Sequence, residues 1–274
     1  MKPQNISANL SPLPSGHPHK WAWEAKLEAS GYSLIAGVDE AGRGPLAGPV
    51  YAAACILSPV RLIDGLDDSK RLKPRQREQL FRQIIQQAVA YAVAAVPVAL
   101  IEKINIRQAS RLAMLVAVQA LRPAATALLI DHEPLLSTGL AQFYPDHGDA
   151  ASDSIAAASI LAKVSRDELL RDLDLQWPGY GLSQNKGYGT KAHTEALRRL
   201  GASPQHRPLF LRKLRLTPAQ TIPLAQLDGF ALAARLDQAF PQAASGQLTA
   251  ETLARLTWLN QACLKFQGGS GCPQ

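Results

Sequence analysis

Runs of apolar residues bounded by glycine, proline or polar residues recur along the first half of the chain. Short apolar runs between turn-forming residues are typical of buried strands. We therefore predict strands at residues 32–38, 50–57, 88–100 and 126–130, with a glycine-rich turn between the first two. The last of these segments follows a predicted helix, which favours a parallel, buried strand.

Other segments repeat their apolar residues at the spacing of a helix. We predict helices at residues 21–29, 75–87, 106–121, 153–173 and 192–200. Ser152 or Asp153 is suited to cap the start of the long helix at 153–173, and Gly201 is suited to end the last one. Together with the strands, these helices predict an α/β protein.

The composition changes near residue 216. Charged residues become fewer there, Gln, Ala and Leu dominate, and residues 224–240 and 248–266 are predicted to be amphipathic helices. We predict an N-terminal extension at residues 1–30, a main domain at 31–215 and a C-terminal helical extension at 216–274, to which the sequence assigns no role.

Composition excludes several classes of protein. With 274 residues, of which 47% are hydrophobic and 19% charged, the chain is long and apolar enough to form a sizeable core. Its longest apolar run, residues 88–101, is shorter than the roughly 18–20 residues of a membrane span, and no secretory signal is recognisable, so we expect a cytoplasmic protein with no membrane partner. The 3 cysteines form no CxxC pair, which argues against a disulfide framework or a zinc site.

Basic residues outnumber acidic ones, 29 to 22, for a formal net charge of +7. Most of the excess lies between residues 34 and 215, while residues 216–274 carry as many acidic as basic side chains. A basic central region indicates a polyanionic partner, most simply a nucleic acid.

Four carboxylates occupy positions from which they could meet. Asp39 and Glu40 end the first predicted strand, Asp131 ends the strand at 126–130, and Asp149 lies just before the long helix. Ends of neighbouring strands converge in an α/β sheet. Such crowded acids repel one another unless cations neutralise them, and oxygen ligands select Mg²⁺ or Mn²⁺. Two such ions are the apparatus of phosphodiester hydrolysis, although any one acid taken alone is better explained as a surface or capping residue.

Further segments have the composition of a nucleic-acid contact. Gly42-Arg43-Gly44 could approach a sugar–phosphate chain closely, although a tight turn explains it equally well. Lys70 begins a basic run that is interpreted as a phosphate contact or a solvated face. Tyr188, in a Gly-rich loop, is suited to stacking on a sugar or base, or to packing. No catalytic role is assigned to the histidines, among them His132, His193 and His206.

Six segments in order along the chain resemble those of one known family. They read IAGVDEAGRGPLAGPV at 35–50, DDSKRL at 67–72, NIRQAS at 105–110, LLID at 128–131, SIAAASILAKVSRD at 154–167 and NKGYGT at 185–190, the last followed by His193. On these motifs the chain resembles ribonuclease HII, the type 2 RNase H of bacteria. The first and fifth motifs are long and specific.

The resemblance implies an RNase H-like fold, a mixed β-sheet flanked by α-helices, and a catalytic domain at 31–215. It implies that Asp39, Glu40, Asp131 and Asp149 are the catalytic, metal-binding acids, with Mg²⁺ or Mn²⁺ and no small-molecule cofactor. It further implies that Gly42-Arg43-Gly44 and Tyr188 recognise a ribonucleotide followed by a deoxyribonucleotide.

The substrates implied by the resemblance are RNA–DNA hybrids and duplex DNA that contains ribonucleotides. The family cuts the RNA strand of the former and nicks 5′ to a single ribonucleotide in the latter, leaving 3′-hydroxyl and 5′-phosphate ends. We expect Lys70 and the basic run after it to hold phosphates, with a steep dependence on salt, and we expect a monomer.

The chain departs from the family at two places, and two alternatives stay open. His132-Glu133-Pro134 follows the third acid where relatives have other residues, and Asp146 and Asp153 compete with Asp149 for the role of fourth acid. One alternative is a non-catalytic nucleic-acid-binding protein on the same fold, which the four acids disfavour. The other is a different RNase H-like nuclease, which the DEAGRG and AASILAKVSRD motifs disfavour.

Overall fold

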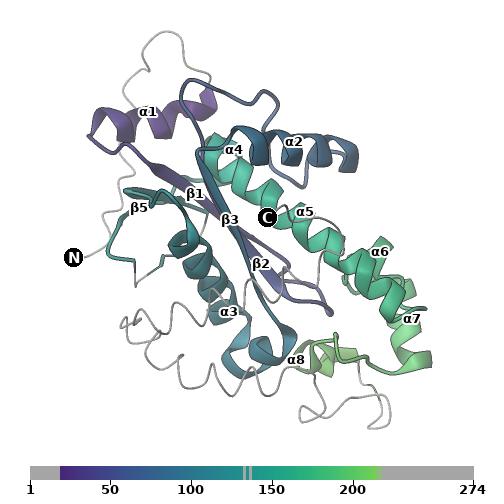
Figure 1. Cartoon of the computed structure of the whole chain (residues 1–274). Helices are drawn as coiled ribbons and strands as arrows, with labels where there is room; N and C mark the ends of the chain where they lie inside the picture. The colour runs from purple at the N-terminus through teal and green to yellow at the C-terminus, as the bar shows by residue number, and fades with distance from the viewer. Residues whose placement is uncertain (1–18, 132–133, 136–137, 215, 217–274) are drawn as a thin grey trace, which may run out of the picture. The chain divides into compact units, whose positions relative to one another are not determined.

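The computed structural model of the protein describes residues 19–131, 134–135, 138–214 and 216 (Figure 1). The predicted helices at 224–240 and 248–266, and with them almost all of the C-terminal extension, lie outside these residues. His132 and Glu133 lie outside them as well. No helix in the described part of the chain is long and apolar enough to cross a membrane.

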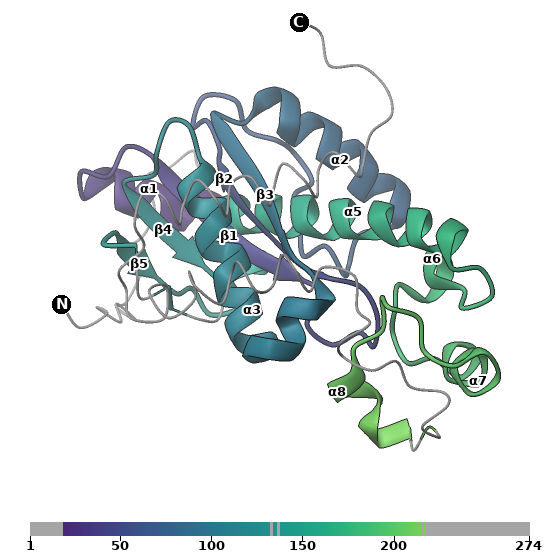
Figure 2. The same cartoon turned by 60° about the horizontal axis from the view of Figure 1, so that its bottom comes forward.

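A five-stranded mixed sheet has the order β3-β2-β1-β4-β5. The strands are β1 (Ile35–Ala41), β2 (Val50–Ile56), β3 (Ala90–Val96), β4 (Ala127–Ile130) and β5 (Ala141–Phe143). Strand β4 runs parallel to both of its neighbours, β1 and β5, and the three lie side by side in Figure 2. The expectation of a parallel, buried β4 is therefore confirmed.

The helices lie at or near the predicted positions, with exceptions. They are α1 (Ala22–Ala29), α2 (Pro74–Gln87), α3 (Val98–Ala120), α4 (Gly148–Ala151), α5 (Asp153–Gln176), α6 (Leu182–Asn185), α7 (Lys191–Leu200) and α8 (Pro208–Leu211), with short 3-10 turns η1 (His19–Trp21) and η2 (Arg212–Leu214). The Ser152 hydroxyl accepts a hydrogen bond from the Ile155 amide at 3.2 Å, so Ser152 is the predicted cap of α5.

The structure differs from the sequence prediction at several places. The strand predicted at 88–100 ends at Val96, and α3 begins at Val98 because the apolar residues after Pro97 are helical. Inside α3, Asn105 has a φ of 64° and interrupts the helix, which explains why helical periodicity was recognised only after that residue. Strand β5 and the short helices α4, α6 and α8 were missed, since elements this short carry no period that the sequence could reveal.

The chain divides into two compact units. Among the described residues, the first unit contains those within Met1–Ala41, Ala52–Ala94 and Ala113–Val164, and the second contains those within Gly42–Tyr51, Ala95–Leu112 and Ser165–Gln274. In the first unit, Ile155 of α5 packs with Leu129 of β4 and Phe143 of β5. In the second, a separate core holds side chains from the end of α5 and from α6, α7 and α8, including Leu170, Leu182, Leu197 and Leu211.

Backbone meets backbone where β1 passes the start of α5 in the first unit. A Cβ atom added at Gly37 would lie 2.0 Å from the carbonyl carbon of Ser154 and 2.3 Å from the nitrogen of Ile155. Only a residue without a side chain permits this approach. Gly37 therefore sets the distance between the strand that carries Asp39 and the helix that follows Asp149.

Candidate active site

The pairing of β1 with β4 brings two of the four acids together. Val38 lies opposite Ile130 in the register of the two parallel strands, and the Asp131 amide donates to the Val38 carbonyl at 3.1 Å. Asp39 is the next residue within β1, which continues to Ala41 rather than ending at residue 38 as predicted, and Asp131 directly follows β4. Both carboxylates therefore lie at the same edge of the sheet, as the positions of the acids after predicted strands had led us to expect.

Asp39 is the buried member of this cluster, with a side chain only 6% exposed. Its Oδ1 accepts a hydrogen bond from the Glu40 amide at 2.7 Å. Burial raises the pKa of Asp39 well above its usual range, and the charges of Glu40 and Asp131 raise it further. The carboxylates of these three residues thus feel one another in a place where water screens them poorly.

Asp149 joins the cluster through the short helix α4. The Gly148 amide donates to Asp131 Oδ1 at 3.3 Å, and a Cβ at Gly148 would lie only 3.0 Å from that oxygen. Burial raises the pKa of Asp149, and so do the charges of Asp68 and Asp131. The structure therefore places Asp149, rather than the exposed Asp146, beside Asp131.

Asp68 is an acid at this site that sequence reasoning did not select. Its carboxyl shares a hydrogen bond with that of Asp149, and its charge raises the pKa of Asp149. Asp68 Oδ1 also accepts a hydrogen bond from the Lys70 amide at 2.8 Å. The only available signal was its position inside the DDSKRL motif, which by itself does not distinguish Asp67 from Asp68.

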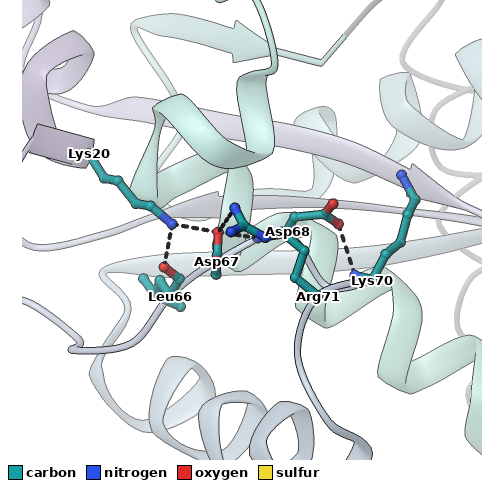
Figure 3. A network of polar contacts seen from close by, with 6 residues as sticks. All are labelled: Lys20, Leu66, Asp67, Asp68, Lys70 and Arg71. Atoms are coloured by element: carbon teal, nitrogen blue, oxygen red, sulfur yellow. Dashed lines mark hydrogen bonds and ion pairs between the residues drawn. The ribbon is translucent and has the colours of Figure 1, made fainter.

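The segment before α2 brings Lys70 to the same cluster. In Figure 3, Asp67 forms an ion pair with Lys20 at 2.7 Å and accepts the Asp68 amide at 2.9 Å, which fixes the start of the turn. Lys20 also donates to the Leu66 carbonyl at 2.8 Å. Partial burial lowers the pKa of Lys70, but the surrounding carboxylates outweigh it and raise that pKa overall; they are Asp68, Asp39, Asp149 and Asp131.

The donor set of the cluster matches a hard divalent cation. Asp39, Glu40, Asp131 and Asp149 supply only carboxylate oxygens, the ligands that Mg²⁺ and Mn²⁺ prefer. Burial and, after it, the charges of neighbouring acids raise the pKa of Asp39 and of Asp149, and a cation would relieve the repulsion between these acids. Among the described residues, no three or more His, Cys, Asp or Glu side chains are already close enough together to hold a metal ion, so the acids would have to draw together around a bound cation.

Glu24 is a second residue that sequence reasoning missed. This carboxylate of α1 is 1% exposed, and its Oε1 accepts the Ser152 hydroxyl at 2.5 Å and the Ser154 amide at 3.0 Å. It therefore holds the junction between α4, which carries Asp149, and α5. We had predicted residues 1–30 as an extension, and their described part belongs to the first unit with the acids.

Replacing Glu24 with glutamine is expected to flatten the dependence of stability on pH. Burial raises the pKa of Glu24 from 4.5 to about 7. Between these values the unfolded chain ionises before the folded one, so the free energy of unfolding is highest below pH 4.5 and falls until about pH 7. At about 1.4 kcal/mol for each pKa unit, the free energy of unfolding of the wild type falls by roughly 3 kcal/mol over this range.

Urea unfolding of both proteins from pH 5 to pH 8 measures this effect. The amide oxygen of the Glu24→Gln variant still accepts both hydrogen bonds. As the pH rises, the free energy of unfolding of this variant should increase relative to that of the wild type. Glu28→Gln on the same helix is the matched control and should follow the wild type. A constant difference between Glu24→Gln and wild type across this range would show that Glu24 does not titrate there.

The predicted substrate-binding residues other than Lys70 belong to the second unit, where two of its loops meet. The Leu46 amide donates to the Gly187 carbonyl at 2.7 Å, and a Cβ at Gly44 would lie 3.6 Å from the ring of Tyr188. Tyr188 is 48% exposed. The structure thus brings Gly42-Arg43-Gly44 and Tyr188 together, as a joint contact with one ligand requires.

A buried polar chain lies behind Tyr188. His193 Nδ1 bonds to the Tyr188 carbonyl at 2.8 Å, His193 Nε2 bonds to His206 Nε2 at 3.0 Å, and His206 Nδ1 accepts the Ser203 amide at 3.0 Å. Burial lowers the pKa of both histidines, to about 3 for His206. Both rings are therefore neutral, and His193 supports the tyrosine loop rather than catalysis.

The fold and the acids together define a class of protein. The crystal structure of the ribonuclease H2 from Pyrococcus horikoshii OT3 superposes with a TM-score of 0.59 at 28% identity, covering 66% of this chain and 97% of that one. The protein therefore has the RNase H-like fold that the motifs implied, with acids at the end of paired β-strands.

Sequence comparison gives the family. A model described as Ribonuclease HII matches residues 36–213. Ribonuclease HII of Desulfitobacterium hafniense (strain Y51) is 54% identical over 187 residues, covering 68% of this chain and 72% of that protein. That of Geobacillus kaustophilus (strain HTA426) is 50% identical over 188 residues, covering 69% and 72%. The chain belongs to the ribonuclease HII family.

Membership confirms the predicted activity at the level of the reaction. The protein is a hydrolase, an endonuclease of the RNase H type that acts on RNA in RNA–DNA hybrids. The alternative of a non-catalytic binding protein is thereby set aside.

Proposed function

We propose that the enzyme nicks duplex DNA on the 5′ side of an embedded ribonucleotide, as well as cutting RNA–DNA hybrids. Asp39, Glu40, Asp131 and Asp149 are the catalytic, metal-binding acids of this proposal. The observation that carries it is the pairing of β1 with β4, which sets a buried Asp39 beside Asp131 at one sheet edge.

Each acid has a defined part in this mechanism. Asp39, Glu40, Asp131 and Asp149 would hold the divalent cations through their carboxylate oxygens, with Asp39 and Glu40 on β1, Asp131 directly after β4 and Asp149 on α4. When bound, two Mg²⁺ or Mn²⁺ ions supply an activated water and stabilise the departing 3′ oxygen. The products carry 3′-hydroxyl and 5′-phosphate ends. Because Asp39 is buried, bulk water competes less with the substrate for the acids and for the ions that they would hold.

Recognition of the ribonucleotide is assigned to the second unit. The 2′-hydroxyl is the one group that distinguishes RNA from DNA locally, and backbone amides of Gly42-Arg43-Gly44 are its proposed donors. Tyr188 stacks on the next sugar, where a second 2′-hydroxyl would clash. The Tyr188 ring lies near Gly44, where an added Cβ would be 3.6 Å from it, and this closeness supports recognition of the two neighbouring sugars together. Lys70 holds a phosphate near the acids.

Replacing Tyr188 with alanine is expected to reduce cleavage at a single ribonucleotide by about tenfold or more, the size of one lost stacking contact. Cleavage of a continuous RNA–DNA hybrid should fall less. Initial rates on the two substrates measure the ratio. Tyr91→Ala is a matched control, because Tyr91 is 44% exposed and Tyr188 48%. Wild-type cutting at a single ribonucleotide by Tyr188→Ala would refute the stacking role.

The experiment that tests the proposed function uses three labelled duplexes of one sequence. One contains a single ribonucleotide, one is an RNA–DNA hybrid and one is all DNA, each with Mg²⁺, Mn²⁺ or EDTA. We expect metal-dependent nicking 5′ to the ribonucleotide and no cutting of all-DNA duplex. Cutting of the hybrid alone would refute the junction specificity.

Because one chain supplies all four acids, we also propose a monomer, which light scattering would test.

A further inference from the structure

Two arginines of the second unit are almost completely buried. Arg166 is 1% exposed and Arg207 is 0% exposed. Burying a guanidinium costs free energy unless its donors are satisfied. Both side chains donate to main-chain carbonyls of the segments that carry the proposed ribose contacts.

Arg207 binds the inner side of the Gly42–Gly44 turn. Its Nη2 donates to the Gly42 carbonyl at 2.7 Å, and its Nη1 donates to the Arg43 carbonyl at 3.0 Å. The Nε and Nη2 atoms both donate to the Gly48 carbonyl, at 2.9 Å and 2.7 Å. One planar side chain therefore fixes both ends of this loop, a geometry that the single ammonium of lysine cannot reproduce.

Arg166 links the same loop to the tyrosine loop. Its Nε donates to the Pro49 carbonyl at 3.1 Å, its Nη2 to the Ala47 carbonyl at 3.0 Å, and its Nη1 to the Lys186 carbonyl at 3.0 Å. The fit to Gly42 is tight, since a Cβ there would lie 2.1 Å from Arg166 Nε. Glycine is required at residue 42 for this reason and because its φ is +97°.

The direction of these carbonyls fixes the direction of the amides beside them. In a trans peptide the C=O of one residue and the N–H of the next point in opposite directions. With the Gly42 and Arg43 carbonyls bound to Arg207, the N–H groups of Arg43 and Gly44 point away from the buried guanidinium. Gly44 is exposed, so this outward side is open to a ligand.

We propose that Arg207 and Arg166 are positioning residues for ribose recognition, because they hold the Arg43 and Gly44 amides in the orientation that donates to a 2′-hydroxyl. The assignment rests on the proposed function of the Gly42–Gly44 segment. It differs from a purely structural role in one respect: weakening the arginines reduces discrimination between ribose and deoxyribose, not duplex binding in general.

The test compares Arg207→Lys and Arg166→Lys with Arg199→Lys, the same change at an exposed residue of α7. All are made in full-length protein with Asp39→Asn, so that the duplexes stay intact in Mg²⁺. Fluorescence anisotropy gives the Kd for a duplex with one ribonucleotide and for the all-DNA duplex. The Kd for the all-DNA duplex divided by the Kd for the duplex with one ribonucleotide measures discrimination between ribose and deoxyribose.

We expect Arg207→Lys to reduce this ratio by about tenfold, the effect of losing one or two oriented hydrogen bonds, with affinity for all-DNA duplex changed less than about twofold. Arg166→Lys should give a smaller reduction, and Arg199→Lys none. Equal weakening of both affinities, or an unchanged ratio in a folded Arg207→Lys protein, would overturn the proposal.

Hydrogen exchange separates this proposal from the proposed function and does not require that an arginine variant folds. In the protein with only Asp39→Asn, amides of the peptide spanning 42–49 should be protected by the ribonucleotide duplex more than by the all-DNA duplex. Equal protection by the two duplexes would refute recognition of the 2′-hydroxyl by these amides, and with it the positioning role of the two arginines. Selective protection with an unchanged ratio in Arg207→Lys would overturn the arginine role alone.

Discussion

Replacing Asp39 with asparagine is expected to reduce cleavage by at least about a thousandfold while leaving the protein folded. Asparagine has nearly the same shape, and its Oδ1 still accepts the Glu40 amide that Asp39 accepts at 2.7 Å. It lacks the negative charge that a divalent cation requires. Rates on a single-ribonucleotide duplex in Mg²⁺, measured with the wild type in parallel, give the size of the loss.

The same substitution should raise the melting temperature in EDTA. Burial and the charges of Glu40 and Asp131 make an ionised Asp39 unfavourable without a cation. Removing that charge should therefore stabilise the metal-free protein, by about 1–3 kcal/mol. Asp146→Asn is the control, because Asp146 is an exposed carboxylate that the sequence alone could not separate from Asp149. This substitution should change neither the cleavage rate nor the melting temperature in EDTA. An Asp39→Asn protein that cuts normally would remove Asp39 from the mechanism.

The candidate acids could be found from the sequence because strand ends and acid positions are local signals. Asp39 and Asp131 each follow a run of apolar residues, and pairing of the two runs places the acids together. The fourth acid illustrates the limit of this reasoning. Asp146 and Asp149 have equal local merit in the sequence, and what favours Asp149 is its closeness to Asp131, seen in the hydrogen bond from Gly148 to Asp131 and in the effect of Asp131 on the pKa of Asp149.

The residues that support the site could not be predicted, because their partners are distant in sequence. Glu24 binds Ser152 and Ser154 across about 130 positions, and Arg207 binds the Gly42–Gly48 loop across about 160. Nothing near Glu24 or Arg207 in the sequence marks either residue as buried. A charged residue is exposed by default, and only its partners make burial possible.

The residues proposed to act on the phosphate and those proposed to recognise the sugar belong to different compact units. The acids, Lys70 and Glu24 lie in the first unit, and the Gly42–Gly44 segment, Tyr188 and the two arginines lie in the second. Substitutions in the first unit should therefore change the rate on every substrate alike. Those in the second should change the preference among substrates.

Replacing Gly37 with alanine is expected to cost about 3 kcal/mol or more of stability. The added Cβ would lie 2.0 Å from the carbonyl carbon and 2.2 Å from the carbonyl oxygen of Ser154, and backbone atoms cannot rotate away as a side chain does. Strand β1 and helix α5 must therefore move apart, which also disturbs the bonds of Glu24 to Ser152 and Ser154.

Because small proteins are stable by only about 5–15 kcal/mol, such a loss should lower the urea midpoint and the soluble yield markedly. Gly44→Ala is the matched control for stability. Its Cβ would meet only the Tyr188 ring, at 3.6 Å, which is an ordinary contact. The Gly44→Ala protein should unfold at nearly the wild-type midpoint. If the Gly37→Ala protein also unfolded at nearly the wild-type midpoint, Gly37 would not be what sets the distance between β1, which carries Asp39, and α5.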